Sequence, residues 1–219
     1  MIPLKDDNPT IHFPFITISL ISLNIIIFIL QFTYPGGIGK LAFSYGAIPA
    51  AILTMESVQP IHPALTVFTS MFMHGGLFHI AGNMLYLWIF GNNIEDKLGP
   101  VRFIIFYLFC GIIAAYSHAI TEPSSNIPMI GASGAVSGIL GAYVLLFPKA
   151  KVHTLIFLGF FIQVVRIPAL FVIGFWAIIQ LINVIIIGTA GVAWFAHIGG
   201  FLIGILAIKL FLKIRRRYY

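Results

Sequence analysis

The stretch GASGAVSGILGAY at residues 131–143 contains no charged side chain, yet a serine stands near its start among small residues. Small residues at this spacing are typical of a helix that packs closely against another helix in an apolar environment. Ser133 would then be a hydroxyl at the start of such a helix. The rest of the chain indicates which environment surrounds it.

The composition is that of a membrane protein. Of the 219 residues, 60% are hydrophobic and only 8% are charged, and the mean hydropathy is +1.05. A bilayer core about 30 Å thick needs roughly 20 apolar residues per helix. The chain therefore predicts an all-α membrane protein, a single domain over 1–219 formed by a bundle of six transmembrane helices. The expected spans are about 15–32, 77–90, 102–120, 131–147, 168–187 and 192–212.

The basic residues are distributed unevenly between the two faces of such a bundle. The face with both chain ends carries eleven Lys and Arg, including those of the run KIRRRYY at 213–219, and the other face carries only Lys40. This bias predicts that both termini are cytoplasmic. The net charge of +6 is then expected to meet anionic membrane lipid rather than nucleic acid. A single cysteine, Cys110, excludes an intramolecular disulfide.

Four polar side chains lie near the outer ends of spans two, four and six, which run in the same direction. His79 and Asn83 are one turn apart on the second span. Ser133 begins the fourth span, and His197 lies about 8 Å from the start of the last at 1.5 Å per residue. An ionisable residue inside a span indicates function, because burying it in hydrocarbon costs free energy.

Glycines suggest how these spans could meet. Gly134 and Gly138 share one helix face, and Gly200 and Gly204 share another, so spans four and six are predicted to pack closely. Gly131 gives the chain a compact turn into span four.

A hydroxyl and an imidazole at matching depth suggest a nucleophile and its general base. All six acidic residues lie outside the spans, so we expect a dyad of Ser133 and His197 without a carboxylate. The free N–H groups at the start of span four would help to bind the oxyanion of an acyl transfer. The Asn83 amide and a His79 ring N–H would complete that site from span two.

Three separated motifs resemble the rhomboid intramembrane serine proteases: MHGGLFHIAGNMLYLWIFGNNIEDKLG at 73–99, GASGAVSGILGAY at 131–143 and AWFAHIGGFLIG at 193–204. The resemblance implies Ser133 as nucleophile, His197 as base, and His79 and Asn83 as oxyanion support. It also implies that His74 shapes a water-accessible cavity. The expected substrates are membrane proteins cut in or beside a transmembrane segment that unwinds readily. The expected location is a prokaryotic cell membrane, with the site open to the extracytoplasmic side.

Supporting positions follow the family pattern only in part. Glu95 and Gly99 resemble the turn after the second span, and Gly131 and Gly134 flank the serine as in the motif. Many relatives carry Trp-Arg in the first outer loop, where this chain has Leu65-Thr66. Some relatives stack a tyrosine on the base, where this chain has Ser137. The sequence therefore leaves open what orients His197.

The region around span five has two features of its own. The segment TLIFLGFFIQVV at 154–165 is too short to cross a bilayer and is predicted to lie at the cytoplasmic interface. The alternative is one long helix interrupted by Pro168. Span five has only two polar side chains, Gln180 and Asn183, and the resemblance implies that it is a mobile gate for lateral access.

Other functions compete with proteolysis. Inactive relatives bind membrane clients without cutting them, but they lack the nucleophile or the base, and this chain keeps both. A metal site of His74, His79 and His197 is disfavoured because no acid within a span could support it. We therefore expect no metal and no other cofactor. A channel or transporter is disfavoured because no inverted repeat is visible. Each polar residue taken alone also fits a packing role, and the sequence carries no signal for an oligomeric state.

Overall fold

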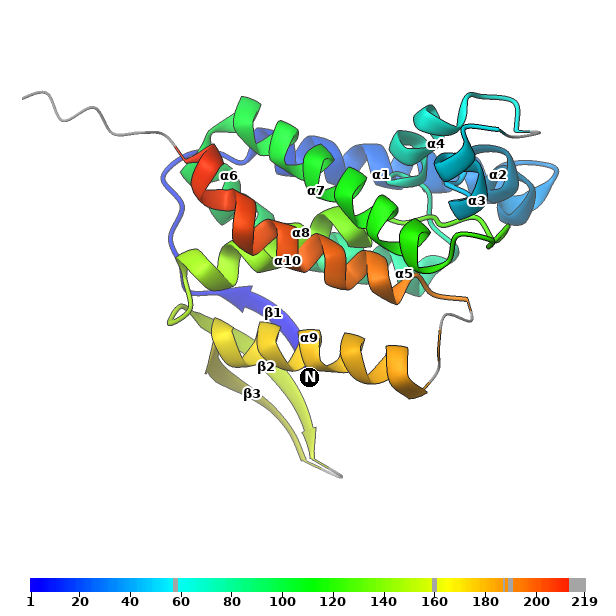
Figure 1. Ribbon diagram of the computed structural model, residues 1–219. Coiled ribbons are helices and arrows are strands. Elements are labelled where there is room, and N and C mark those ends of the chain that lie inside the picture. Colours follow the sequence, from blue (N-terminus) through cyan, green and yellow to red (C-terminus); the bar gives the residue numbers. More distant parts are fainter. Residues whose placement is uncertain (57–58, 159–160, 187, 189–190, 213–219) are drawn as a thin grey trace, which may run out of the picture.

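The computed structural model describes residues 1–56, 59–158, 161–186, 188 and 191–212. Its helices form a bundle, and a small sheet lies beside one end of it, next to α9 (Figure 1). The helices are α1 (Phe15–Thr33), α2 (Gly37–Tyr45), α3 (Pro49–Thr54), α4 (Pro63–Ser70), α5 (Leu77–Tyr86), η1 (Leu87–Gly91), α6 (Asn92–Leu98), α7 (Pro100–Thr121), α8 (Ser133–Leu146), α9 (Ala169–Ile186) and α10 (Trp194–Phe211). The strands are β1 (Ile2–Asp6), β2 (Lys151–Leu158) and β3 (Phe161–Pro168).

Four of the described helices are long and apolar enough to cross a membrane, namely α1, α7, α9 and α10. They correspond to the first, third, fifth and sixth predicted spans. The second predicted span is helical through α5, η1 and α6, with a π-helical turn in the middle. The fourth predicted span, α8, has only 14 residues. The chain is thus a mostly helical membrane protein, and the number of six spans with cytoplasmic ends stays a prediction. The basic run at 213–219 lies outside the described residues.

The prediction of an all-α protein is wrong at the segment 154–165. It belongs to a hairpin of β2 and β3, and β1 adds to β2 to give an antiparallel sheet in the order β1-β2-β3. A single long helix up to Pro168 is also excluded, because β3 runs to that residue. The segment is rich in Val, Ile, Thr and Phe, which favour strands. In β2, the alternate residues Val152 and Thr154 turn to one face and are fully buried.

Polar contacts attach the sheet to the helices. The carboxylate of Asp6, at the end of β1, accepts hydrogen bonds from the hydroxyl of Tyr143 in α8 and the amide of Asn93 in α6. Burial raises the pKa of Asp6. The next residue, Asp7, lies 2.7 Å from the ring of His153 in β2, and this hydrogen bond lowers the pKa of Asp7. Asp6 and Asp7 at the end of the first strand therefore connect α6 and α8 to the hairpin.

A buried carboxylate connects the second predicted span to the first helix. Glu95 is 4% exposed and accepts hydrogen bonds from the backbone N–H groups of Ile16 and Thr17, at 2.9 and 2.8 Å, and from the Thr17 hydroxyl at 2.7 Å. The first N–H groups of a helix lack partners inside it, and negative charge is favoured there. Gly99, with a φ of +76°, then turns the chain into α7.

The central helix α8 packs against both α7 and α10, which also pack against each other. A Cβ at Gly200 or Gly204 of α10 would overlap the carbonyl oxygen of Gly134 or Gly138 of α8, so the two backbones touch. The close packing of the fourth and last predicted spans is therefore confirmed. The glycines of α8 do not all face the same partner, because Gly134 turns toward Ala114 of α7. Packing on both sides fixes the start of α8 relative to α10.

Candidate active site

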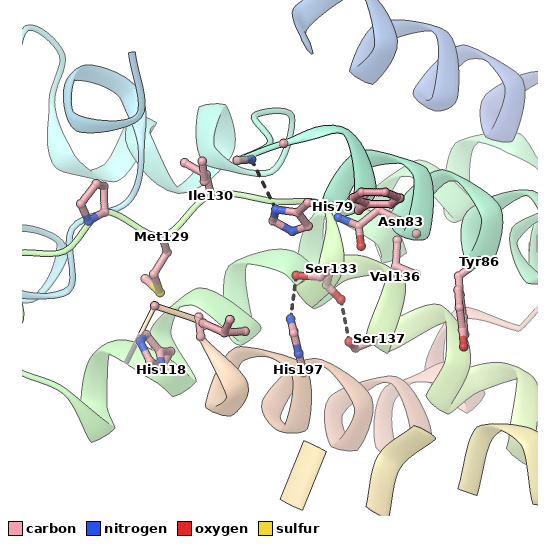
Figure 2. A pocket seen from close by; sticks show the side chains of 18 of the residues that line it. His79, Asn83, Tyr86, His118, Met129, Ile130, Ser133, Val136, Ser137 and His197 are labelled. Carbon is pink, nitrogen blue, oxygen red and sulfur yellow. Dashed lines mark hydrogen bonds between the residues drawn. The ribbon is translucent and has the colours of Figure 1, made fainter. Parts of the chain in front are cut away.

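Ser133 and His197 meet inside the bundle. Ser133 is the first residue of α8, and its Oγ lies 2.8 Å from Nε2 of His197, in the first turn of α10. Figure 2 shows the two side chains pointing at each other from the two helices. A hydroxyl within hydrogen-bond distance of an imidazole is the arrangement in which a base can activate a nucleophile.

Helix α9 supplies a partner for the other ring nitrogen of the histidine. Oε1 of Gln180 is 2.8 Å from Nδ1 of His197, and the Gln180 side chain is buried. The rings of Trp176 and Trp194 also flank the imidazole, with centroids 6.3 and 5.8 Å from it. The sequence marked Gln180 only as a polar residue of an apolar span, although an amide there is itself a signal of a bond between helices.

The position that holds a tyrosine in some relatives does not contact the histidine. The hydroxyl of Ser137 donates instead to the carbonyl oxygen of Ser133, one turn earlier in α8, at 2.6 Å. Besides Ser133 of α8, the groups that lie against the His197 ring are thus Gln180 and Trp176 of α9 and Trp194 of α10.

His79 and Asn83 stand on the side of Ser133 opposite to His197 (Figure 2). The backbone N–H of Gly75 donates to Nδ1 of His79 at 3.3 Å, so the neutral ring carries its proton on Nε2. That nitrogen lies against Gly131, where a Cβ would stand 2.7 Å from it. Nδ2 of Asn83 is buried and has no hydrogen-bond partner among the described residues. A ring N–H and an unpaired amide are therefore available next to the hydroxyl.

Two of the expected supporting residues lie elsewhere. His74 is fully buried and is not among the residues that line the cavity against Ser133 and His197. Its ring packs edge to face on His79, with centroids 5.1 Å apart, while its backbone N–H donates to Gln31 at 3.0 Å. His74 thus supports His79 from behind rather than lining a water-accessible cavity. Gly134, which faces Ala114, serves helix packing.

A cavity of about 930 Å³ lies against the serine and the histidine, within the size range of ligand pockets. In Figure 2 it reaches from His118 and Met129 on one side to Tyr86 on the other. Its walls come from α5, α7, α8, α9 and α10, and from the loop before α8. Polar side chains gather at the end near α7, where Glu122 and Ser125 line it with His118. Within the described ranges, no three His, Cys, Asp or Glu side chains are grouped so as to hold a metal ion.

These features define a helical membrane protein with a partly open cavity lined by a serine and a histidine that lie within hydrogen-bond distance of each other. The chain belongs to the rhomboid family, because the Rhomboid domain model matches residues 62–214. The resemblance carried by the three sequence motifs is thereby confirmed. The match includes every element that contributes a residue to the site.

Three relatives illustrate the similarity. The presenilin-associated rhomboid-like protein, mitochondrial, of Mus musculus is 31% identical over 179 residues, which are 75% of this chain and 44% of that protein. RHOMBOID-like protein 12, mitochondrial, of Arabidopsis thaliana is 33% identical over 170 residues, 70% of this chain and 48% of that protein. Rhomboid protein 1, mitochondrial, of Saccharomyces cerevisiae is 32% identical over 97 residues, 42% of this chain and 28% of that protein. The chain spans less than half the length of these relatives.

The predicted location in a prokaryotic cell membrane is wrong. The relatives just described are mitochondrial proteins by name. The charge bias between the two faces of a bundle orients it relative to a membrane, but it does not distinguish one kind of membrane from another.

Proposed function

We propose that this chain is an intramembrane serine endopeptidase that cleaves membrane proteins within or beside a transmembrane segment. The observation that carries the proposal is the 2.8 Å distance between Ser133 Oγ and His197 Nε2 at the wall of a partly open cavity. Membership of the rhomboid family supports it.

The reaction begins with attack of Ser133 Oγ on the scissile carbonyl carbon while His197 Nε2 takes the hydroxyl proton. The product is a tetrahedral intermediate beside an imidazolium. Its oxyanion is held by Nε2–H of His79 and Nδ2–H of Asn83. The backbone N–H of Ser133 contributes a third bond, because the first residue of a helix has no acceptor inside it.

Collapse of the intermediate breaks the C–N bond. The imidazolium gives its proton to the leaving amine, and an acyl ester remains on Ser133. His197 then takes a proton from water while the water oxygen attacks the ester carbon. As the ester C–O bond breaks, His197 returns the proton to Ser133 Oγ, and the new carboxyl end is released. The polar side chains at the α7 end of the cavity, His118 and Glu122 among them, mark the route by which water arrives.

The short length of α8 suits a reaction below the membrane surface. Its 14 residues extend about 21 Å, which is less than a hydrocarbon core of about 30 Å. Ser133 can therefore lie inside the bilayer while the far end of α8 reaches the opposite face. The irregular backbone before it is tolerated at that depth because it lines a cavity.

Substrate enters sideways, past α9. Only Ala169, Val172, Ile173 and Gln180 of this helix are buried, so most of its surface is free of other helices. A substrate segment must unwind locally before attack, because hydrogen bonds within a helix shield its peptide bonds. The proposal includes a six-span topology with both ends on the face opposite the cavity mouth. It also includes residence in a mitochondrial membrane, in contact with its lipids, following the names of the relatives.

Cleavage of a single-span model substrate tests the proposal, with purified protein and substrate reconstituted together in lipid vesicles. Wild type is expected to cut, and Ser133→Ala and His197→Ala are expected to be silent although folded. Ser137→Ala is the matched control, because this serine lies one turn along α8 and does not bond to the histidine. Cleavage by Ser133→Ala at the wild-type rate would contradict the assignment.

The second candidate function is the binding of membrane clients without cleavage. It is favoured by the large cavity alone. In the same assay it predicts that wild type and Ser133→Ala retain the substrate equally and that neither yields a product.

A further inference from the structure

The amide of Gln180 links α9 to the proposed base. Its Oε1 lies 2.8 Å from Nδ1 of His197, and the side chain is 6% exposed. The other end of the amide is also committed, because Nε2 donates to the backbone carbonyl of Trp176 at 3.0 Å. A glutamine held at both ends has one orientation, with its oxygen toward the imidazole.

This orientation decides where the histidine carries its proton. An amide oxygen only accepts hydrogen bonds, so Nδ1 of His197 must be the protonated nitrogen of the neutral ring. Nε2 then presents a lone pair to the hydroxyl of Ser133, 2.8 Å away. In the opposite tautomer, the lone pair of Nδ1 would face the lone pairs of Gln180 Oε1, which are both acceptors. Nε2–H would then point at Ser133 Oγ and could not take its proton.

We infer that Gln180 is a positioning residue that holds His197 in the tautomer and ring orientation needed to deprotonate Ser133. The inference rests on the proposed function and adds Gln180 to the expected dyad of Ser133 and His197 as a third, orienting group. A neutral amide takes this place in the Cys-His-Asn sites of papain-like proteases, so a carboxylate is not required. When the ring becomes an imidazolium, its Nδ1–H bond to Oε1 becomes charge-assisted and strengthens.

The rings beside the histidine complement this bond. Trp176 and Trp194 lie beside the imidazole, with the first ring tilted by 38° to it and the second nearly perpendicular, at 86°. Neither tryptophan can accept a hydrogen bond from Nδ1–H through its indole nitrogen, because that nitrogen is a donor only. Among the described residues, the amide of Gln180 is thus the group that selects the tautomer.

Two substitutions at this position separate the role from simple packing. Gln180→Leu keeps the approximate size of the side chain but removes the amide oxygen that accepts the hydrogen bond from Nδ1–H of His197. We expect its kcat to fall tenfold or more while KM stays within about twofold, since the residue touches the base and not the substrate. Gln180→Glu keeps the acceptor and adds a charge, so we expect it to retain activity. Its carboxylate favours the imidazolium, so the acid limb of its rate profile is expected to move to higher pH.

The variants leave the other histidines of the site unchanged, and a neighbouring polar residue of α9 serves as the control position. His79 and His118, the other histidines that line the cavity with His197, are present in every variant. Asn183→Leu removes the second polar side chain of α9, three residues further along. It is expected to keep the wild-type kcat and pH profile.

The experiment measures kcat, KM and the pH profile of cleavage by reconstituted wild type and the three variants, with thermal unfolding of each. A Gln180→Leu enzyme with wild-type kcat overturns the inference, as does a Gln180→Glu enzyme with an unshifted acid limb. The second readout holds even if Gln180→Leu fails to fold. Failure of the proposed function looks different, because wild type would then be inactive or Ser133→Ala would cut as well as wild type.

Discussion

Gly204 of α10 lies directly on Gly138 of α8, where a Cβ would stand 2.7 Å from the Gly138 Cα and closer still to its carbonyl oxygen. Because both contacts are backbone, no side-chain rotation can make room for a methyl group. This contact and the equivalent one at Gly200 set the separation of the two helices that carry His197 and Ser133.

Gly204→Ala is expected to lower the free energy of unfolding by about 1–3 kcal/mol, the usual cost of overpacking. It should also reduce cleavage, because α10 must move away from α8. Gly174→Ala in α9 is the control, since nothing lies within 4 Å of a Cβ there. Thermal unfolding and the cleavage assay check both variants, and equal stability of the two would contradict the backbone contact.

Glu95→Ala is expected to destabilise the protein by at least about 2 kcal/mol, because it leaves buried N–H and O–H donors at the start of α1 unpaired. Glu56→Ala, which removes an exposed carboxylate, should leave the melting temperature unchanged. Chemical unfolding in detergent measures the difference. A Glu95→Ala protein as stable as the Glu56 variant would show that α1 does not depend on this carboxylate.

The pairing of Asp7 with His153 predicts a dependence of stability on pH. Since the hydrogen bond from His153 lowers the folded-state pKa of Asp7 below 3.8, the unfolded chain takes up this proton first as the pH falls. The stabilisation is therefore complete above 3.8 and is lost as the pH falls from that value through the folded pKa.

Asp7→Asn should consequently melt below wild type near neutral pH, and the gap should close in acid. Melting temperatures at several pH values between 7 and 3 test this expectation. A gap that stays constant across the range would mean that the carboxylate charge of Asp7 plays no part.

The fold could be predicted from the sequence where apolar length is the controlling quantity. Four helices long enough to span a bilayer follow from runs such as Phe15–Thr33 and Pro100–Thr121, because hydrocarbon imposes internal hydrogen bonding. The hairpin was missed because a short apolar run has no decisive period, and strand pairing depends on a partner far away in sequence. The pairing of β1 with β2 joins residues about 150 positions apart, as in Ile2 with Leu155.

The site could be predicted in part for a related reason. The four predicted residues lie near the starts of α5, α8 and α10, which run in the same direction. Their positions along these helices therefore place them at a similar depth, namely Ser133, His197, His79 and Asn83. Gln180 could not be paired with His197 in this way, because the contact depends on how α9 is rotated about its own axis.

Gly131→Ala is expected to impair cleavage more than folding. The backbone there has a φ of +132°, which disfavours any side chain, and a Cβ would stand 2.7 Å from Nε2 of His79. Displacing that ring removes one oxyanion donor, so kcat should fall by about 10²-fold or more. Gly76→Ala is the control, because its backbone is extended and its Cβ would meet nothing within 4 Å. If both variants cut equally well, the position of the His79 ring beside Gly131 is not required for cleavage.

Asn83 offers a test in which stability and activity should move apart. Its Nδ2 is buried without a partner among the described residues, and an unsatisfied buried donor costs about 1–3 kcal/mol. Asn83→Leu removes that cost, so its melting temperature should equal or exceed that of wild type. If the amide binds the oxyanion, kcat should nevertheless fall by about 10²–10³-fold.

The matched variant is Asn93→Leu in α6, whose amide is paired with Asp6. It should behave in the opposite way, with a loss of about 1–3 kcal/mol in stability and little change in the kcat of the folded enzyme. Thermal unfolding and kcat measured on the same preparations separate the two cases. An Asn83→Leu protein that melts early and still cuts at the wild-type rate would identify Asn83 as a packing residue, because the loss of stability would mean that its amide is paired in the folded protein and the unchanged rate that it does not bind the oxyanion.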